Sequence, residues 1–296
     1  MRRRWMYLAA GMILSFLFNQ AFTYQDAATQ APRLIEQIDH ILLVPDNPRG
    51  LFDFLTQDLK LPVAWPFREY GSFASGGVFA GNVNLEAAVL SGGSAQTMSK
   101  IAGIAFEPSG STEEVVRELD RRQIAHLEPQ PFEMGPDGNK MKLWTNTVLK
   151  DMLPGSFVFI CEYHIYKIRN TEPSAVRNQL RETLRKADGG PLGIAYVSEV
   201  KIKVKERYKV LENWKKFLAP YEGFQDDCFD LGEGPKIRFS EADVDRIESI
   251  EIKVKSLEKA FSFLSPRRMV GTKNERRIVT DPNKTFGIIF EFVEVD

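Results

Sequence analysis

The sequence predicts an α+β protein that contains four similar modules, each with a strand, a helix and two or three further strands (βαβββ). The strand-then-helix pattern begins at four places, which are Ile38, Ile101, Val197 and Ile247. In the strand parts apolar residues alternate, as in Ile250, Ile252 and Val254, and in the helix parts the apolar spacing changes to three and four. Because one such module cannot bury a face of its own sheet, modules must pair, and four of them imply two paired domains.

The first two modules are expected in residues 37–170. The first begins with "IDHILLVPD", continues as a helix in "NPRGLFDFLTQDL" and ends with strand-like runs up to "NVNLEAAVL". The second begins with "IAGIAFEP", and Ser111 followed by Glu114 is typical of a capping box at the start of a helix. The last strands of this module are expected in "KLWTNTVLKDMLPGSFVFICEYHIY".

The last two modules are expected in residues 190–296, after a connecting helix in residues 171–189 that Gly189 and Gly190 would end. The third module begins with "VSEVKIKV" and has later strands in "CFDLGEGPKIRFSE". The fourth begins with "IESIEIKV" and has later strands in "RRIVTDPNKTFGIIFEFVEV". The lysines of "VKIKVKERYK" alternate with core residues, so they predict a solvated face of the sheet.

The composition is that of an ordinary globular protein. The chain has 296 residues, of which 43% are hydrophobic and 27% are charged. Its 39 basic and 40 acidic side chains give a formal net charge of −1, which argues against a nucleic-acid-binding protein. The two cysteines, Cys161 and Cys228, match neither a zinc cluster nor a disulfide framework. Cys161 is expected to be a buried strand residue, and a single disulfide between the two is the alternative.

Residues 1–22 have the form of an export signal. Three arginines at positions 2–4 precede an uncharged apolar run from Trp5 to Phe18. This run is shorter than the roughly 20 residues that span a bilayer, and no clear cleavage site of small residues follows it. We therefore expect a cleaved signal or a retained membrane anchor, residues 23–36 as a linker, and a folded part outside the cytoplasm, periplasmic or extracellular. An apolar first helix of the fold is the alternative.

His40 lies within an apolar strand. In "IDHILLVPD" Ile38, Leu42 and Val44 would share the face of this histidine, because side chains alternate along a strand. A buried imidazole needs a hydrogen-bond partner or a metal ion. Of the other two histidines, His126 is expected at the surface or in a turn.

These motifs resemble the vicinal oxygen chelate superfamily, also called the glyoxalase/bleomycin-resistance/dioxygenase fold. "IDHILLVPD" is similar to the first strand of this family, and "IESIEIKVKSLEKAFSFL" is similar to the same strand running into its helix. "TDPNKTFGIIFEFVEV" resembles the closing strand, in which a glutamate stands between apolar residues. The resemblance covers the chain from about residue 37 to the end. It implies that two paired modules form a cup, in which several members bind a divalent metal through residues of the first and last strands.

The resemblance implies a metal site in the first pair of modules. His40 stands at the first-strand position, while Glu86 and Glu162 are the last-strand candidates. These three residues are the expected ligands of a divalent metal ion, since one imidazole and two carboxylates suit such an ion. Gly103 stands at the first-strand position of the second module and cannot be a ligand. Glu162 and His164 are the expected catalytic bases.

The resemblance leaves the reaction open. A metal ion in the cup would serve a lyase, an isomerase or a dioxygenase that acts on a small organic substrate with vicinal oxygens. The alternative is a metal-free protein of the bleomycin-resistance type, which binds a small molecule in a cup lined by Trp65, Phe67, Tyr70 and Trp144. On that alternative His40 is a hydrogen-bonded strand residue and Glu86 pairs with Arg68. A homodimer is left open.

The second pair of modules is expected to hold no metal. Its first-strand positions are Glu199 and Ser249, and no histidine follows His164. The closing strand keeps Glu291, but the other last strand offers Arg238 instead of a clear acid. Two carboxylates and a serine with basic neighbours bind a soft or borderline metal poorly.

Overall fold

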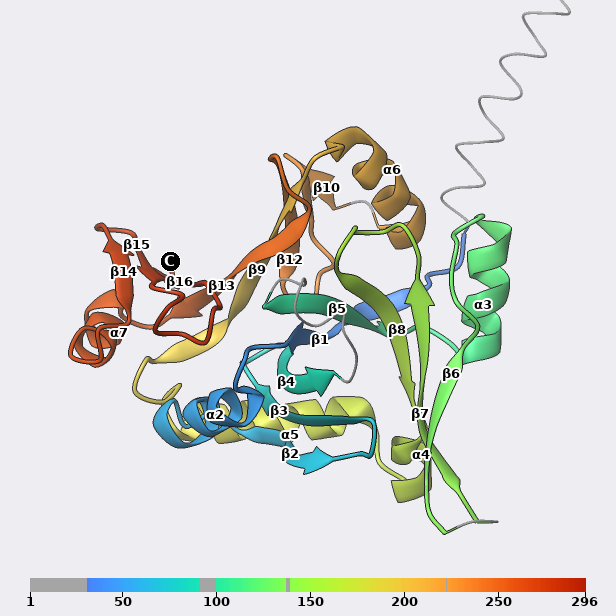
Figure 1. Ribbon diagram of the computed structural model, residues 1–296, viewed down its shortest axis with the longest axis horizontal. Helices are drawn as coiled ribbons and strands as arrows, with labels where there is room; N and C mark the ends of the chain where they lie inside the picture. The colour runs from blue at the N-terminus through green and yellow to red at the C-terminus, as the bar shows by residue number, and fades with distance from the viewer. Residues whose placement is uncertain (1–30, 91–99, 137–138, 222) are drawn as a thin grey trace, which may run out of the picture.

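The computed structural model contains two eight-stranded sheets, both of them curled (Figure 1). It describes residues 31–90, 100–136, 139–221 and 223–296. The predicted export segment, residues 1–22, and the first residues of the predicted linker lie outside the described residues. Within the described ranges, no helix has the length and apolar character needed to cross a membrane.

The first sheet holds the first two modules. Its strands follow the spatial order β2-β3-β4-β1-β5-β8-β7-β6. Their bounds are β1 (Ile35–Leu43), β2 (Val63–Glu69), β3 (Phe73–Phe79), β4 (Asn84–Leu90), β5 (Ile101–Pro108), β6 (Gln130–Met134), β7 (Met141–Leu149) and β8 (Phe157–Tyr163). The first strands of the two modules, β1 and β5, pair antiparallel at the centre, and each pairs in parallel with the last strand of its own module. The two modules are therefore related across the β1–β5 pair.

The second sheet repeats this arrangement with the third and fourth modules. Its strands follow the order β10-β11-β12-β9-β13-β16-β15-β14. Their bounds are β9 (Ile194–Val204), β10 (Phe224–Gln225), β11 (Cys228–Phe229), β12 (Lys236–Glu241), β13 (Arg246–Val254), β14 (Val270–Lys273), β15 (Arg277–Thr280) and β16 (Phe290–Glu294). The predicted α+β fold of four βαβββ modules in two pairs is confirmed.

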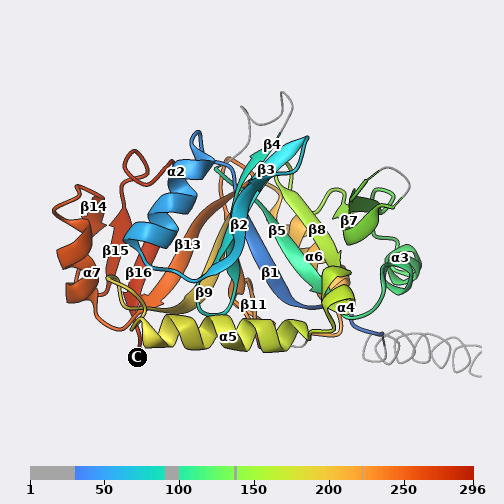
Figure 2. The same cartoon turned by 90° about the horizontal axis from the view of Figure 1, so that it is seen from below.

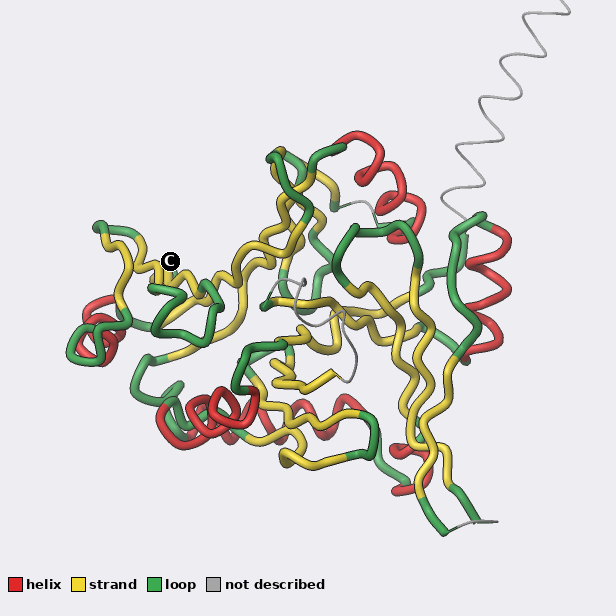
Figure 3. Tube along the Cα trace, viewed as in Figure 1, coloured by secondary structure: helices red, strands yellow, loops and turns green. Residues whose placement is uncertain are grey.

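One helical segment follows the first strand of each module, and the helices lie at the periphery of the sheets (Figure 3). These segments are α2 (Pro48–Asp53) with the π-helix η1 (Phe54–Asp58), α3 (Thr112–Arg121), α6 (Arg207–Leu218) and α7 (Leu257–Leu264). The predicted capping box forms at α3, where the amide of Glu114 donates to Ser111 Oγ at 3.3 Å and the amide of Ser111 donates to Glu114 Oε2 at 2.9 Å.

Two further helices connect the sheets in the sequence, α4 (Ile165–Arg169) and α5 (Pro173–Lys186). Figure 2 shows α5 as a straight helix along one side of the molecule. It lies within the range 171–189 in which a connecting helix was expected. Its Arg177 forms an ion pair of 2.7 Å with Glu107 of β5, which ties this helix to the first sheet.

The two sheets share one hydrophobic core. Helix α6 of the third module packs on the first sheet, because the rings of Trp214 and Phe217 contact Phe106 of β5 with centroids 6.1 and 5.1 Å apart. A polar contact also joins the halves: the side chain of Asn82 accepts from the amide of Val197 at 3.0 Å and donates to its carbonyl at 2.9 Å. Each half therefore needs the other to bury its apolar surface.

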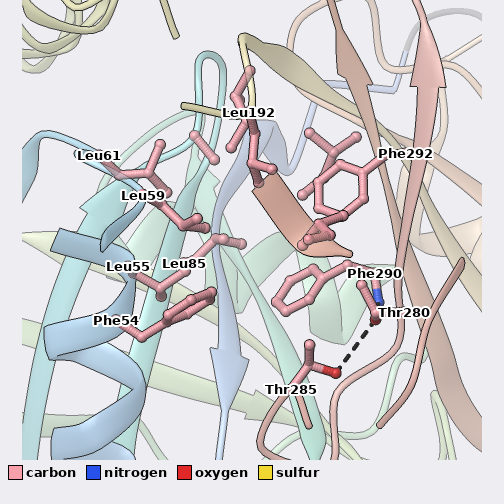
Figure 4. Close-up of a pocket in the computed structure, with 14 residues that line it drawn as sticks. Phe54, Leu55, Leu59, Leu61, Leu85, Leu192, Thr280, Thr285, Phe290 and Phe292 are labelled. Atoms are coloured by element: carbon pink, nitrogen blue, oxygen red, sulfur yellow. Dashed lines mark hydrogen bonds between the residues drawn. The ribbon is translucent and has the colours of Figure 1, made fainter. Parts of the chain in front are cut away.

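Figure 4 shows a second contact region between the halves, where the segment around η1 meets the second sheet. Most of the side chains there are apolar, and they include Phe54, Leu55, Leu85, Leu192, Phe290 and Phe292. The space that they enclose is about 10 Å³, which is room for one water molecule at most. This region is packed core and not a ligand site.

Both cysteines are buried and free. Cys161 on β8 lies with Ala105 and Phe159 in a small apolar cluster, as expected for a buried strand residue. Cys228 on β11 forms no bond with it, so the alternative of a disulfide is wrong.

Candidate functional site

A β-bulge turns both Asp39 and His40 toward one cavity. In the pairing of β1 with β5, Ile38 lies opposite Phe106, but His40 lies opposite Ala105, the very next residue. Asp39 is therefore an extra residue on β1, and a bulge of this kind re-aims the side chains beside it. The prediction that Ile38 shares the face of His40 is wrong, because Ile38 lies in the main core on the other face of the sheet.

His40 is buried between two carboxylates. Its Nδ1 lies 2.6 Å from Oδ2 of Asp39, and its Nε2 lies 3.0 Å from Oε2 of Glu86. The hydroxyl of Tyr163 donates to the same Asp39 oxygen at 3.1 Å. Burial by itself lowers the pKa of His40, but the charges and hydrogen bonds of Glu86 and Asp39 outweigh it and raise the pKa to about 10. At neutral pH the ring is an imidazolium, and Glu86 pairs with this ring and not with Arg68.

The residues Asp39, His40 and Glu86 lie in the wall of a cavity of about 1110 Å³ on one face of the first sheet. We call this cavity the first cup. Much of its wall is aromatic, with Trp65, Tyr70, Phe73, Phe132, Trp144, Phe159 and Tyr163. The volume lies slightly above the range of about 300 to 1,000 Å³ that is typical of sites for drug-sized organic molecules.

The aromatic lining agrees largely with the expectation from the sequence. Trp65, Tyr70 and Trp144 do line the first cup. Phe67 does not: its ring packs against Phe52 of α2, with centroids 5.8 Å apart, and against the main core. Phe67 is two residues after Trp65, so simple alternation would put both side chains on the same face of β2. The pairing of β2 with β3 is irregular between Trp65 and Arg68, and this irregularity breaks the alternation.

Four aromatic residues close the sheet around the first cup. Tyr70 and Phe73, at the turn between β2 and β3, stack with centroids 5.0 Å apart. Phe132 of β6 and Trp144 of β7 stack at 4.2 Å. The two pairs are in contact. The ring centroid of Phe73 lies 5.5 Å from that of Phe132, and the ring centroid of Tyr70 lies 5.9 Å from that of Trp144. Because β2 and β3 lie at one end of the sheet and β6 and β7 at the other, this aromatic clasp joins the two edges.

Glu162 lies on the face of β8 opposite to the first cup. Its neighbours Cys161 and Tyr163 line the cup, and side chains alternate along a strand. Its carboxylate accepts from the amide of Thr112 at 2.9 Å and from the hydroxyl of Thr112 at 2.6 Å. Burial raises the pKa of Glu162, but these hydrogen bonds outweigh it and the pKa is lowered. The carboxylate therefore stabilises the N-terminus of α3.

His164 follows Glu162 on the same side, as predicted, but away from the first cup. Its Nε2 lies 2.8 Å from the hydroxyl of Thr145, and its Nδ1 lies 3.6 Å from Oε1 of Glu162. Burial lowers the pKa of His164, and the attraction of Glu162 offsets only part of this. The structure thus keeps the predicted bases Glu162 and His164 together with each other, and it separates both from His40 and Glu86.

Strand register explains why Glu162 is not a partner of His40. In the first module, Glu86 lies two residues beyond the β4 partner of His40. In the second module, Phe159 lies two residues beyond the β8 partner of Gly103. Phe159 is therefore the equivalent of Glu86, and its ring contacts that of His40 with centroids 5.5 Å apart. The second module therefore places the apolar ring of Phe159 in the first cup, at the position where the sequence predicts a metal ligand.

The residues of the first cup fit a divalent metal ion only in part. A catalytic zinc site, for comparison, takes three protein ligands. The first cup offers His40 and Glu86, whereas Gly103 and Phe159 stand at the other two equivalent positions. In the described part of the chain, no group of three His, Cys, Asp or Glu side chains is placed to hold a metal. The predicted ligand set of His40, Glu86 and Glu162 is therefore not assembled.

Comparison with known proteins finds relatives by structure only. No protein-family model and no curated protein sequence matches the chain. A hypothetical protein from Staphylococcus aureus is 15% identical with a TM-score of 0.54, over 88% of this chain and 99% of that one. The 2,3-dioxygenase LapB from Pseudomonas sp. KL28 is 10% identical with a TM-score of 0.56, over 89% and 93%. Homoprotocatechuate 2,3-dioxygenase from Arthrobacter globiformis is 10% identical with a TM-score of 0.55, over 90% and 81%.

These likenesses extend over both sheets and concern the path of the backbone. At identities of 10% to 15% they describe the fold and not the residues of a site. The four βαβββ modules and their pairing across β1–β5 and β9–β13 agree with the resemblance found in the sequence. The chain therefore has the fold of these solved structures, with four βαβββ modules in two pairs.

Proposed function

We propose that this protein binds a small organic molecule in the first cup. The observation that supports the proposal is a cavity of about 1110 Å³ whose wall combines many aromatic side chains with a single buried charged group, Asp39, His40 and Glu86. Cavities of this kind take an apolar body against the aromatic wall and orient it by a few polar contacts. Binding accounts for a largely buried imidazole with two carboxylates at a cavity wall better than a structural role does, because a stable core does not need such a group.

The polar end of the ligand follows from the charges. Two carboxylates, Asp39 and Glu86, face one imidazolium, so the group carries an excess negative charge. A hydroxyl or amino group that donates a hydrogen bond suits the surface at these two carboxylates. Arg68, Arg169 and Arg177 also line the cavity. We therefore propose a ligand with an apolar body and a donor group at its buried end.

A fluorescence titration of the full chain tests this proposal. The probe is N-phenyl-1-naphthylamine, an aromatic amine that becomes fluorescent in an apolar cavity. Ala88→Phe fills the first cup, because Ala88 is buried and lines it. Val89→Phe is the matched control, since Val89 is the next residue of β4, does not line the cavity and is 42% exposed.

The expected result is one saturable site in the wild type and in Val89→Phe, in the presence of a chelator, and its loss in Ala88→Phe. Equal binding by the two variants would contradict the proposal. Thermal denaturation of both variants, measured in parallel, distinguishes a filled cup from a misfolded protein.

A metal-dependent lyase, isomerase or dioxygenase is the second candidate. Two observations favour it: His40 and Glu86 stand on the first and last strands of one module, and Asp39 holds Nδ1 of the imidazole so that Nε2 faces Glu86. A divalent ion on this pair would have to displace the proton of His40. The test is elemental analysis of the purified full chain, with Glu86→Gln as the variant. One equivalent of metal in the wild type that is lost in Glu86→Gln would favour this candidate.

Export stays a proposal, supported by the arginines and the apolar run within residues 1–22. A reporter fused after residue 36 tests it. We expect the reporter to reach the membrane or the space beyond it, and a soluble cytoplasmic reporter would contradict this expectation. Association with a membrane is proposed through this segment alone, and a homodimer is tested by light scattering of the chain from residue 23 onward.

A further inference from the structure

The second cup is the face of the second sheet that is equivalent to the first cup. It carries a cluster of charged side chains, of which Glu251 and Glu291 are buried. The register of β13 and β16 places Glu251 opposite Glu291, as the register of β1 and β4 places Leu42 opposite Glu86. Ser249 and Glu291 are therefore the equivalents of His40 and Glu86. The hydroxyl of Ser249 donates to Oε1 of Glu291 at 2.6 Å.

Lys201 of β9 reaches into this group. Its Nζ lies 2.8 Å from Oε2 of Glu251 and 2.8 Å from Oε2 of Glu291. The Lys201 side chain is 19% exposed, and each carboxylate side chain is 10% exposed. The sequence-based expectation that the lysines of this strand face solvent is therefore wrong for Lys201, because this face of β9 forms the second cup.

The charges of the second cup balance. A third carboxylate, Glu199, is held by Arg238 with a shortest contact of 2.6 Å. Arg277 of β15 lies 2.8 Å from Glu291 and 3.2 Å from Glu251. Three carboxylates thus face the three cations Lys201, Arg238 and Arg277.

Two buried carboxylates that point at one spot repel each other unless a cation lies between them. A divalent ion is one solution, and an ammonium group that donates to both carboxylates is another. The contacts of Lys201 have the length of charge-assisted hydrogen bonds, and the ammonium comes from the chain itself. We propose that Lys201 takes the place of a metal ion in the second cup, so that this half of the protein is complete without a metal. This inference goes beyond the ligand binding proposed for the first cup and does not depend on it.

The proposal is tested by titrating Mn²⁺ into the full chain and measuring the free ion by electron paramagnetic resonance. All variants carry Glu86→Gln, which removes one of the two carboxylates beside His40 in the first cup. Lys201→Met keeps the length of the side chain and removes its charge. Lys203→Met is the matched control, because Lys203 lies two residues further along β9, is 37% exposed and pairs with Glu248 instead.

We expect no site for Mn²⁺ in the parent protein or in Lys203→Met. Lys201→Met should gain one site, with an affinity on the order of tenfold or more above the nonspecific background. Adding Glu291→Gln to Lys201→Met should abolish the new site. A tight Mn²⁺ site in the parent that is lost on Glu291→Gln would overturn the proposal, and so would a folded Lys201→Met without any site.

If Lys201→Met fails to fold, a second measurement tests the proposal. The double variant Lys201→Met, Glu251→Gln has one uncompensated carboxylate fewer than Lys201→Met alone. Mn²⁺ should raise the melting temperature of this double variant but not that of the parent. A parent protein that is stabilised by Mn²⁺ as much as the double variant would again contradict the proposal.

Discussion

The Nε2 atom of His40 lies 3.0 Å from Oε2 of Glu86, and this contact joins the first and last strands of the first module. The equivalent contact in the fourth module is that between Ser249 and Glu291, at 2.6 Å. The fold thus brings first-strand and last-strand residues together in both cups. The first cup keeps a cavity beside this contact, and Lys201 reaches into the corresponding place in the second cup. The residue types at these positions therefore determine what each cup can do.

The protonated state of His40 should make stability depend on pH. Its pKa is raised from 6.5 in the unfolded chain to about 10 in the folded protein. The folded state therefore holds a proton that the unfolded state releases, so this stabilisation is complete below about pH 6.5 and is lost as the pH rises through about 10. The total is on the order of 5 kcal/mol.

Urea denaturation of the wild type and of His40→Gln at several pH values checks this expectation. The wild type should be the more stable protein near pH 6, and its advantage should shrink steadily toward pH 10. An advantage that is the same at both ends of this range would show that the ring is neutral in the folded protein.

Glu162→Gln should weaken the start of α3 and leave the first cup intact. The carboxylate of Glu162 accepts two hydrogen bonds from Thr112, the first residue of that helix. Losing its charge should cost about 1 kcal/mol of unfolding free energy. Binding of N-phenyl-1-naphthylamine should not change. If the variant has normal stability but no longer binds the probe, Glu162 takes part in the binding site after all.

The aromatic clasp should control how fast a ligand leaves the first cup. Phe132→Ala removes the ring that stacks on Trp144 at 4.2 Å and contacts Phe73 at 5.5 Å. Each such contact contributes about 1 kcal/mol, so stopped-flow fluorescence should show probe dissociation accelerated by roughly tenfold. Phe263→Ala, in α7 of the second half, is the control. If both variants release the probe at the wild-type rate, the clasp plays no part in access.

Gly81→Ala should destabilise the protein, because it disturbs a close contact between the two halves. Gly81 has a φ of +97°, and a Cβ there would lie 2.2 Å from the carbonyl oxygen of Ala195 in β9. We expect a loss of more than about 2 kcal/mol of unfolding free energy in urea. Gly71→Ala is the control, because Gly71 has a φ of +82° but no atom within 4 Å of the added carbon. It should lose only the cost of backbone strain, about 1 to 2 kcal/mol. Equal losses would contradict the close contact between the halves.

Much of the fold could be predicted because its signals are local. Alternation in β9 and β13, helical spacing after them and the capping box at Ser111 all depend on near neighbours in the sequence. His40 and Glu86 could be found because each stands in a strand with a clear pattern, and the structure brings the two together. Their role as ligands stays a prediction.

The remaining errors come from strand register. The bulge at Asp39 adds one residue to β1 and moves Ile38 to the other face, which alternation alone does not reveal. Phe159, not Glu162, proved to be the equivalent of Glu86, because the pairing of β5 with β8 determines that position. Lys201 was assigned to solvent for a similar reason, since a polar residue in an alternating strand has the same pattern whether its face meets water or a cup.

Nuclear magnetic resonance of the imidazole rings tests the central claim most directly, because the chain has only three histidines. His40 lies in the first cup, His164 lies beside Glu162 on the other face of β8, and His126 lies 3.2 Å from Asp120. The protein is labelled with ¹⁵N-histidine and titrated with N-phenyl-1-naphthylamine in the presence of a chelator. Binding in the first cup predicts that the ring signals of His40 shift to saturation while those of His126 and His164 stay in place. Shifts at His164 with none at His40 would contradict the account and place the site on the opposite face of the sheet.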